Sequence, residues 1–291
     1  MTDPRGGRRC HTPLNALHSA VYFSPEFDKE MEALGLAKAP GAYFSAPGYF
    51  AARSAAMGAV GPGTVTAAFF NFSHALIARH VPAVWAVAAP EQVLAARLRA
   101  ADRLLRRLLG DGATASGEMA EAAELARHAA AGCVRAGRPL GSAEADQPVA
   151  QEPHLALWQA ATVLREHRGD GHVALLTQAG LDGIEALVSH TSSGRGFTPA
   201  FARATRGWSE EEWSAAQERL RDKGLLDAEG RLTEAGTALR AELEHETDRL
   251  AAGPYDHLGA AGVARLTELA GGFAATALGN GAFPDGIFGR R

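Results

Sequence analysis

The densest group of side chains able to do chemistry lies between residues 152 and 172. His154, Trp158, Thr162 and Arg165 follow one another at intervals of four, four and three residues. On a helix this spacing places an imidazole, an indole, a hydroxyl and a guanidinium on one side. Such a set could stack on and anchor a planar, acidic ligand. The alternative interpretation is that these residues lie at the end of a helix with their charges in solvent. The arginines there would interact favourably with the negative C-terminal end of the helix dipole.

The same stretch ends in His167, Asp170 and His172, the candidates for a catalytic role. An imidazole oriented by a carboxylate is the usual pair for proton transfer. Gly169 and Gly171 are expected to break the helix here, so the pairing depends on how that turn folds. The sequence therefore predicts a ligand site or an acid–base site in this region, without deciding between them.

No metal site is predicted from these histidines. The motif HExxH is absent, and His167 and His172 are five residues apart, one too many for two ligands on one helical face. Cys10 and Cys133 have no CxxC spacing and are expected to be free thiols. Covalent haem is excluded because no CxxCH occurs, and the sequence leaves the cofactor unknown.

A second candidate set lies in the first half of the chain. His18 and Tyr22 are four residues apart on one predicted helical face, and His74 follows the aromatic residues Phe70 and Phe72. A histidine in such surroundings is more often a hydrogen-bonded core residue than a ligand. The alternative is that these residues line a cleft for an apolar, planar or haem-like molecule.

The elements that must position these side chains are predicted to be helices. Alanine and leucine are abundant, 46% of residues are apolar, and strict alternation of apolar and polar residues is absent. The clearest helix is 90–109, where apolar residues recur every three or four positions between Pro90 and Gly110. Ser209 and Thr233 are expected to cap two further helices. The fold class predicted is mostly α.

Residues 133–152 contain glycine, proline and small polar residues without periodicity, which is typical of a linker. The predicted domains are therefore 12–132 and 153–280. Matches between them keep the same order: Phe50 with Phe201, then Gly58 with Gly207, and further pairs at nearly constant offset. This pattern favours an internal duplication.

Residues 198–250 resemble a winged helix of the MarR family. The resemblance rests on three features: Ser209 followed directly by three glutamates, a short predicted hairpin over 225–232, and the sequence RLTEAG (231–236) at the start of a long predicted helix. It implies that the helix around 258–278 stands where MarR proteins place a dimerisation helix. With the duplication, the chain resembles a MarR dimer fused into one polypeptide, and it also resembles a family of such proteins from actinobacteria. A monomer is then expected.

The features with which MarR proteins read DNA are weak in this chain. The predicted recognition helix, 210–223, has five acidic and three basic residues, and its counterpart, 63–81, is an apolar stretch with Arg79 as its only formal charge. The whole chain has a net charge of −4. DNA lined with phosphates attracts positive charge, so nucleic-acid binding is possible but not favoured.

Three functions remain open from the sequence. The favoured one is a small-molecule-binding protein with its ligand in the cleft between the halves, contacted by candidates from both: His18, Tyr22, His74, His154, Trp158 and Arg165. The second is an enzyme of specialised metabolism that uses the residues between His154 and His172. The third is a DNA-binding regulator. No signal peptide and no apolar run of 18 residues occurs, so we expect a cytoplasmic protein without a membrane partner.

Overall fold

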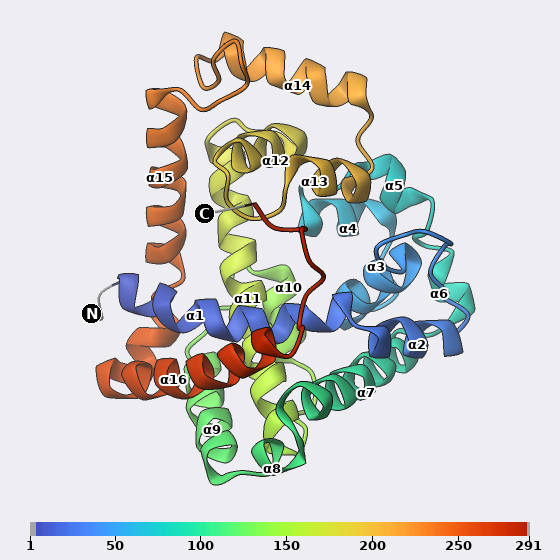
Figure 1. The fold of residues 1–291 in the computed structure, drawn as a ribbon, viewed down its shortest axis with the longest axis vertical. Helices are drawn as coiled ribbons and strands as arrows, with labels where there is room; N and C mark the ends of the chain where they lie inside the picture. The colour runs from blue at the N-terminus through green and yellow to red at the C-terminus, as the bar shows by residue number, and fades with distance from the viewer. Residues whose placement is uncertain (1–3, 290–291) are drawn as a thin grey trace.

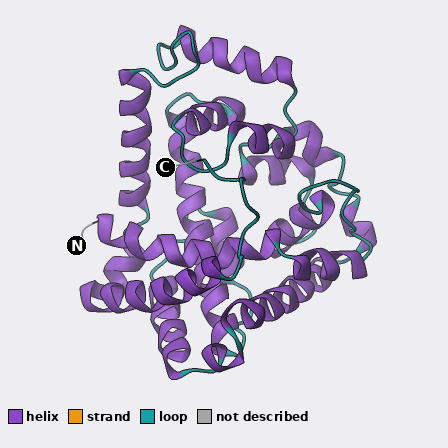
Figure 2. Ribbon diagram, viewed as in Figure 1, coloured by secondary structure: helices purple, strands orange, loops and turns teal. Residues whose placement is uncertain are grey.

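The computed structural model describes residues 4–289, and almost all of its regular structure is helical (Figure 2). The first half contains α1 (Pro4–Ser19), α2 (Pro25–Ala33), α3 (Ala46–Ser54), α4 (Pro62–Phe69), α5 (His74–Ala78), α6 (Val84–Val87), α7 (Pro90–Leu109), α8 (Asp111–Thr114) and α9 (Gly117–Ala131), with 3-10 turns at Ala20–Phe23 and Ala55–Met57. The second contains α10 (Pro139–Ala145), α11 (Pro153–Gln178), α12 (Gly183–Ser192), α13 (Pro199–Arg206), α14 (Glu210–Asp222), α15 (Glu234–Leu250) and α16 (Gly253–Gly279). The prediction of a mostly helical protein is confirmed.

Local chemistry sets many helix ends. The side chains of Ser209 and Thr233 accept hydrogen bonds from backbone N–H groups in the first turns of α14 and α15, as expected of N-caps. Pro90 begins α7, and Gly110, with φ of 84°, follows its last residue. Pro153 begins α11. These predicted boundaries are confirmed because they depend on residues near each terminus.

The helices of the two halves pack against one another rather than forming separate bodies. Helix α1 lies along α16, and α11 lies along α9, while α9 and α16 also touch each other (Figure 1). The main apolar core accordingly contains residues of both halves, from Cys10 to Ala282. A second, smaller core joins α12, α13, α14 and α15 to the end of α11.

Two predicted elements differ from the structure. The helix α11 continues through Gly169 and Gly171, where a break was expected. A Cβ on Gly171 would lie 1.9 Å from Nη1 of Arg138, whose guanidinium donates to the carbonyl of His167 at 2.6 Å. These distances show that Gly171 gives Arg138 room to reach the helix backbone, so the glycine serves close packing and not a turn.

The stretch 63–81, expected as one helix, forms α4 and α5 with a break between them. Phe70 has a positive φ of 45°, and the backbone N–H of Ser73 donates to the carbonyl of Arg206 at 2.9 Å. A hydrogen bond to a segment distant in sequence has replaced a bond within the helix. The break turns residues 70–72 toward the second half of the chain, which becomes important for the site.

The predicted linker and hairpin also take different local forms. Residues 133–152 include α10, which packs on α11 and buries Leu140 and Glu144. The expected hairpin at 225–232 is reduced to a single antiparallel bridge between Leu226 and Leu232. Among residues 4–289 no strand longer than one residue forms.

Candidate functional site

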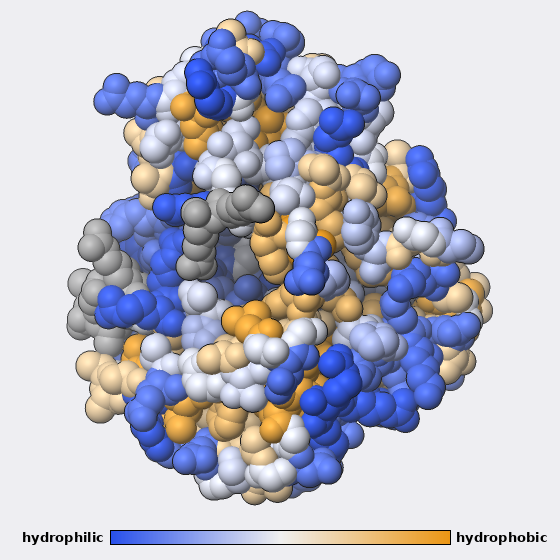
Figure 3. Space-filling view, in the orientation of Figure 1, coloured by the Kyte–Doolittle hydropathy of each residue, from blue (hydrophilic) through white to orange (hydrophobic). Residues whose placement is uncertain are grey.

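A cavity of about 330 Å³ lies where the second core meets the first half of the chain. Its walls come from α11, α12, α13 and α15 of the second half, and from α3 and the break between α4 and α5 in the first. Phe288, near the C-terminus, also lines it. The molecule is visibly hollowed between the part formed by α12 to α15 and the part below it (Figure 3).

Arg206 is the most unusual charged residue of the cavity. Its side chain is 7% exposed, and its guanidinium carbon lies 4.6 Å from the ring centre of Phe72 and 4.9 Å from that of Phe197. Nη1 donates to the hydroxyl of Thr205 at 2.6 Å, and Nε has no hydrogen-bond partner. No carboxylate of the described residues pairs with it. Burial lowers the pKa of Arg206 to about 10, so the group remains positively charged at neutral pH.

Gly207 helps to hold this arginine in place. It ends α13 with φ of 75° in the left-handed region, and a Cβ there would lie 2.5 Å from Cβ of Leu76 and 2.7 Å from Oγ of Ser73. Glycine is therefore required both by the backbone conformation and by the close approach of α5. The turn orients the last residue of α13 toward the cavity.

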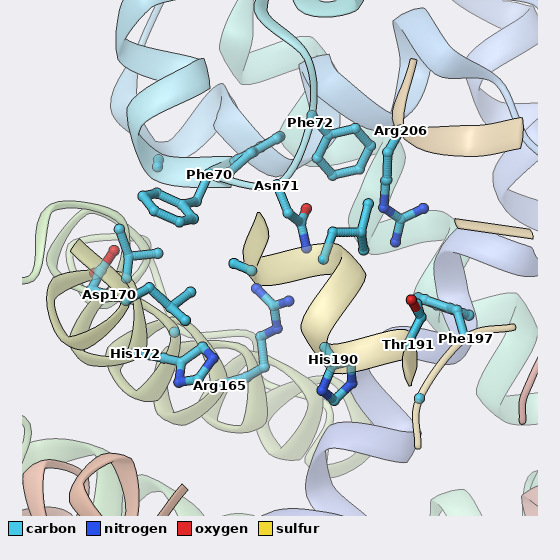
Figure 4. A pocket seen from close by; sticks show the side chains of 18 of the residues that line it. Phe70, Asn71, Phe72, Arg165, Asp170, His172, His190, Thr191, Phe197 and Arg206 are labelled. Carbon is cyan, nitrogen blue, oxygen red and sulfur yellow. The ribbon is translucent and has the colours of Figure 1, made fainter. Parts of the chain in front are cut away.

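A buried ion pair stands beside Arg206. Nη2 of Arg53 donates to both oxygens of Glu166, at 2.7 and 2.8 Å, and Arg165 bonds to the same carboxylate. Burial alone would raise the pKa of Glu166, but Arg165 and Arg53 overcome this effect and lower it to about 2. Figure 4 shows Arg165 and Arg206 with their guanidinium groups, and Asn71 with its amide, directed into the same space.

Two neutral histidines also line the cavity. Burial lowers the pKa values of His172 and His190 to about 4. His172 is hydrogen-bonded through Nδ1 to Thr247 at 2.8 Å, and His190 accepts from Arg240 at 3.1 Å. Both side chains are therefore uncharged at neutral pH.

The charges that line the cavity do not balance. Four guanidinium groups, those of Arg53, Arg165, Arg206 and Arg240, face three carboxylates, those of Glu166, Asp170 and Glu244. When all are ionised, one positive charge is in excess. Burial raises the pKa of Asp170 to about 6, which makes the imbalance larger in mildly acidic solution.

Three of the nine residues singled out from the sequence line this cavity: Arg165, Asp170 and His172. His18, Tyr22 and Trp158 lie together in the main core, where His18 stacks on Trp158 with ring centres 5.5 Å apart. The expectation that Trp158 shares this cavity with Arg165 and His172 is therefore wrong. For His18, the structure agrees with the other interpretation given above, that of a hydrogen-bonded histidine in the core.

His74, His154 and His167 do not line the cavity, and Asp170, which does, also has a partner on α10. Nε2 of the buried His154 lies 2.7 Å from a carboxylate oxygen of Asp102, and the exposed His74 bonds to Thr66. Neither shares the cavity with Arg165, contrary to expectation. His167 packs beside α10, and Asp170 accepts from the N–H of Gly141 at 2.8 Å. The structure forms no hydrogen bond among His167, Asp170 and His172.

Three cavity residues were missed from the sequence, Arg206, His190 and Asn71, whereas Phe70 and Phe72 had been noted as possible lining of a cleft. Asn71 was the one available signal, because a polar amide inside an apolar stretch marks a position unsuited to a helix interior. Nothing adjacent in sequence distinguishes Arg206, since its aromatic neighbours come from residues 72 and 197.

The helix that would read DNA has little free positive charge. Arg219 pairs with Asp182 and Glu185, Lys223 pairs with Glu185, and Arg221 pairs with Glu218. At the tip of the turn that follows, Arg231 pairs with Asp227 at 2.9 Å and with Glu229 at 3.0 Å. Each of these cations already has a carboxylate partner within the chain.

Comparison with known proteins places the chain in one family. A family described as "Helix-turn-helix family" matches residues 7–284, nearly the whole chain. No curated protein and no solved structure matches it significantly. Within residues 4–289 no helix is both long and apolar enough to cross a membrane.

Proposed function

The chain belongs to this helix-turn-helix family, and from that premise we propose that it is a fused pair of MarR-type halves that binds a small organic anion in the cavity between them. The DNA-contacting features of the fold are degenerate in this proposal. The protein acts as a monomer, because the two halves supply to each other the surface that separate subunits would share.

The packing of the helices supports the duplication. The first long helix of each half lies against the last helix of the other, since α1 packs on α16 and α11, which follows the short α10, packs on α9. This reciprocal exchange is what a twofold dimer of equal subunits would show after fusion. The long helices α7 and α15 occupy corresponding places in the order of elements.

The observation that carries the ligand-binding proposal is the buried, unpaired guanidinium of Arg206. Burying a charge without a counterion is costly, and native proteins usually compensate it with a carboxylate or a bound ion. Here the compensation is absent from the described chain, while the guanidinium lies in the wall of a cavity and between two phenylalanine rings. A planar anion would fit both the charge and the flanking rings.

The test is thermal denaturation and titration calorimetry with a panel of planar organic anions and their uncharged amides. A ligand at about 100 times its Kd should stabilise the protein by about 2.7 kcal/mol. Arg206→Met should weaken binding of the anions by at least about 30-fold, because truncating one partner of a buried charge pair costs about 2–5 kcal/mol. The matched control is Arg203→Met, on the same helix but 41% exposed in its side chain. Equal binding of anions and amides, or equal effects of both variants, would refute the proposal.

DNA binding is a second candidate because the family is one of helix-turn-helix proteins. The ion pairs of Arg219, Arg221, Lys223 and Arg231 weigh against it, since each would have to be exchanged for a phosphate. An electrophoretic mobility shift at low salt tests the point. Retardation of a duplex at micromolar protein would establish DNA binding, and its absence would remove it, because nonspecific binding alone should be visible there.

A further inference from the structure

Three histidines of this protein are held by a threonine in the same way. Nδ1 of His18, His74 and His172 lies 2.8 Å from the hydroxyl oxygen of Thr162, Thr66 and Thr247, respectively. In each pair the threonine hydroxyl is also bonded to the carbonyl four residues earlier in its helix. Of the three, only His172 lines the cavity.

This geometry determines which nitrogen of His172 carries the proton. The hydroxyl of Thr247 donates its single hydrogen to the carbonyl of Leu243, at 2.6 Å. It therefore has only lone pairs to offer to His172, and Nδ1 of the histidine must be the donor. Because the ring is neutral at pH 7, with its pKa lowered by burial to about 4, Nε2 has a free lone pair.

The neighbouring histidine has the opposite arrangement. Arg240 can only donate, so Nδ1 of His190 accepts its hydrogen bond and Nε2 carries the proton. That nitrogen faces the loop, where a Cβ on Gly196 would lie 2.4 Å away. His190 therefore offers no acceptor to the cavity, whereas His172 does. Figure 4 shows the His172 ring directed inward from α11.

We propose that the ligand carries, in addition to its anionic group, a hydroxyl or N–H donor that bonds to Nε2 of His172. The guanidinium of Arg206 binds the anionic group of the ligand, and Nε2 of His172 accepts a hydrogen bond from the ligand's hydroxyl or N–H. Together the two residues select a hydroxylated or aminated organic anion over an unsubstituted one. Among residues 4–289 no side chain or backbone group satisfies Nε2. When an unsubstituted ligand binds, it excludes water from Nε2 of His172 and gives no hydrogen bond in return. The acceptor then has no partner, and this cost disfavours the unsubstituted compound. This inference rests on the proposed function.

The test uses 2-naphthoate and its 5-, 6- and 7-hydroxy isomers as probes, so that the protein itself selects the separation between anion and donor. By calorimetry at pH 7, at least one isomer should bind about tenfold more tightly than 2-naphthoate. His172→Phe should abolish that preference, so that in this variant no hydroxy isomer binds more tightly than 2-naphthoate. The matched control, His74→Phe, removes an equivalent threonine-bound imidazole from an exposed site and should preserve the preference.

A measurement on the unmodified protein covers the case in which His172→Phe does not fold. Nitrogen-15 NMR of the histidine side chains should show His172 protonated on Nδ1 and bare on Nε2, with the Nε2 resonance shifting when the preferred isomer binds. A proton on Nε2, or equal affinity for all four probes, would overturn the inference. Failure of every planar anion, including 2-naphthoate, to bind would instead refute the proposed function itself.

Discussion

Replacing Arg206 with methionine should not destabilise the ligand-free protein, although the residue is buried. The fall in the pKa of Arg206 from its ordinary value to about 10, caused first by burial and then by the nearby Arg53 and Arg165, corresponds to about 3 kcal/mol against the charged form. The contacts with the two phenylalanine rings stabilise the charged guanidinium by about 1–2 kcal/mol, and the hydrogen bond to Thr205 stabilises it by about 1 kcal/mol. The net effect of Arg206→Met is expected to lie between no change and a gain of about 1 kcal/mol.

The sign of the pH dependence agrees with this expectation. The folded-state pKa of Arg206 lies below the unfolded one, so the unfolded state holds the proton more tightly from about pH 10 up to the ordinary pKa of arginine. The destabilising contribution of the charged group is therefore fully present at neutral pH, begins to lessen as the pH rises through about 10, and is lost only above the ordinary pKa of arginine.

The assay is equilibrium urea unfolding at pH 7, with Arg53→Met as the matched control. Arg53 is equally buried, at 6% exposed, and its guanidinium lies 4.4 Å from the ring centre of Phe69, but it is paired with Glu166. Breaking a buried ion pair costs about 3–5 kcal/mol, so this control should be strongly destabilised. If Arg206→Met loses as much stability as Arg53→Met, then Arg206 is a structural cation and the reasoning is refuted.

Three further predictions follow from the same site and packing. Glu166→Gln should destabilise the protein by about 3 kcal/mol at pH 7 in urea unfolding. The stability advantage of the wild type is present above the ordinary pKa of 4.5 and should fade as the pH falls toward about 2, the folded-state pKa of Glu166. A variant as stable as the wild type at pH 7 would contradict this. Asp170→Asn should raise stability at pH 7 but not at pH 4, because burial raises the pKa of Asp170 to about 6 and the wild type loses stability as the pH rises through that value. An equal effect at both pH values would count against it. Sedimentation equilibrium should show a monomer of 30.4 kDa, whereas an obligate dimer would argue against the fused-pair proposal.

The sequence by itself determined the helices whose ends depend on nearby residues. Pro90 with Gly110, Pro153, Ser209 and Thr233 each act within one turn of the boundary that they define, so their chemistry is visible in a short window. The apolar content and the absence of alternation were enough to predict a mostly helical chain. Arg165, Asp170 and His172, which line the cavity, had been singled out because they are close together in the sequence.

Tertiary structure decided the rest, because the deciding partners are distant in sequence. From the sequence, Gly171 is expected to break a helix, but in the structure it leaves room for Arg138 to pack against the helix. Residues 63–81 are expected to form one helix, but the N–H of Ser73 instead donates to the carbonyl of Arg206. Arg206 became a candidate binding residue only in the structure, where it lies between the rings of Phe72 and Phe197 and pairs with no carboxylate of residues 4–289. Burial and pairing of a charge are properties of its three-dimensional surroundings, and the local spacing of residues does not record them.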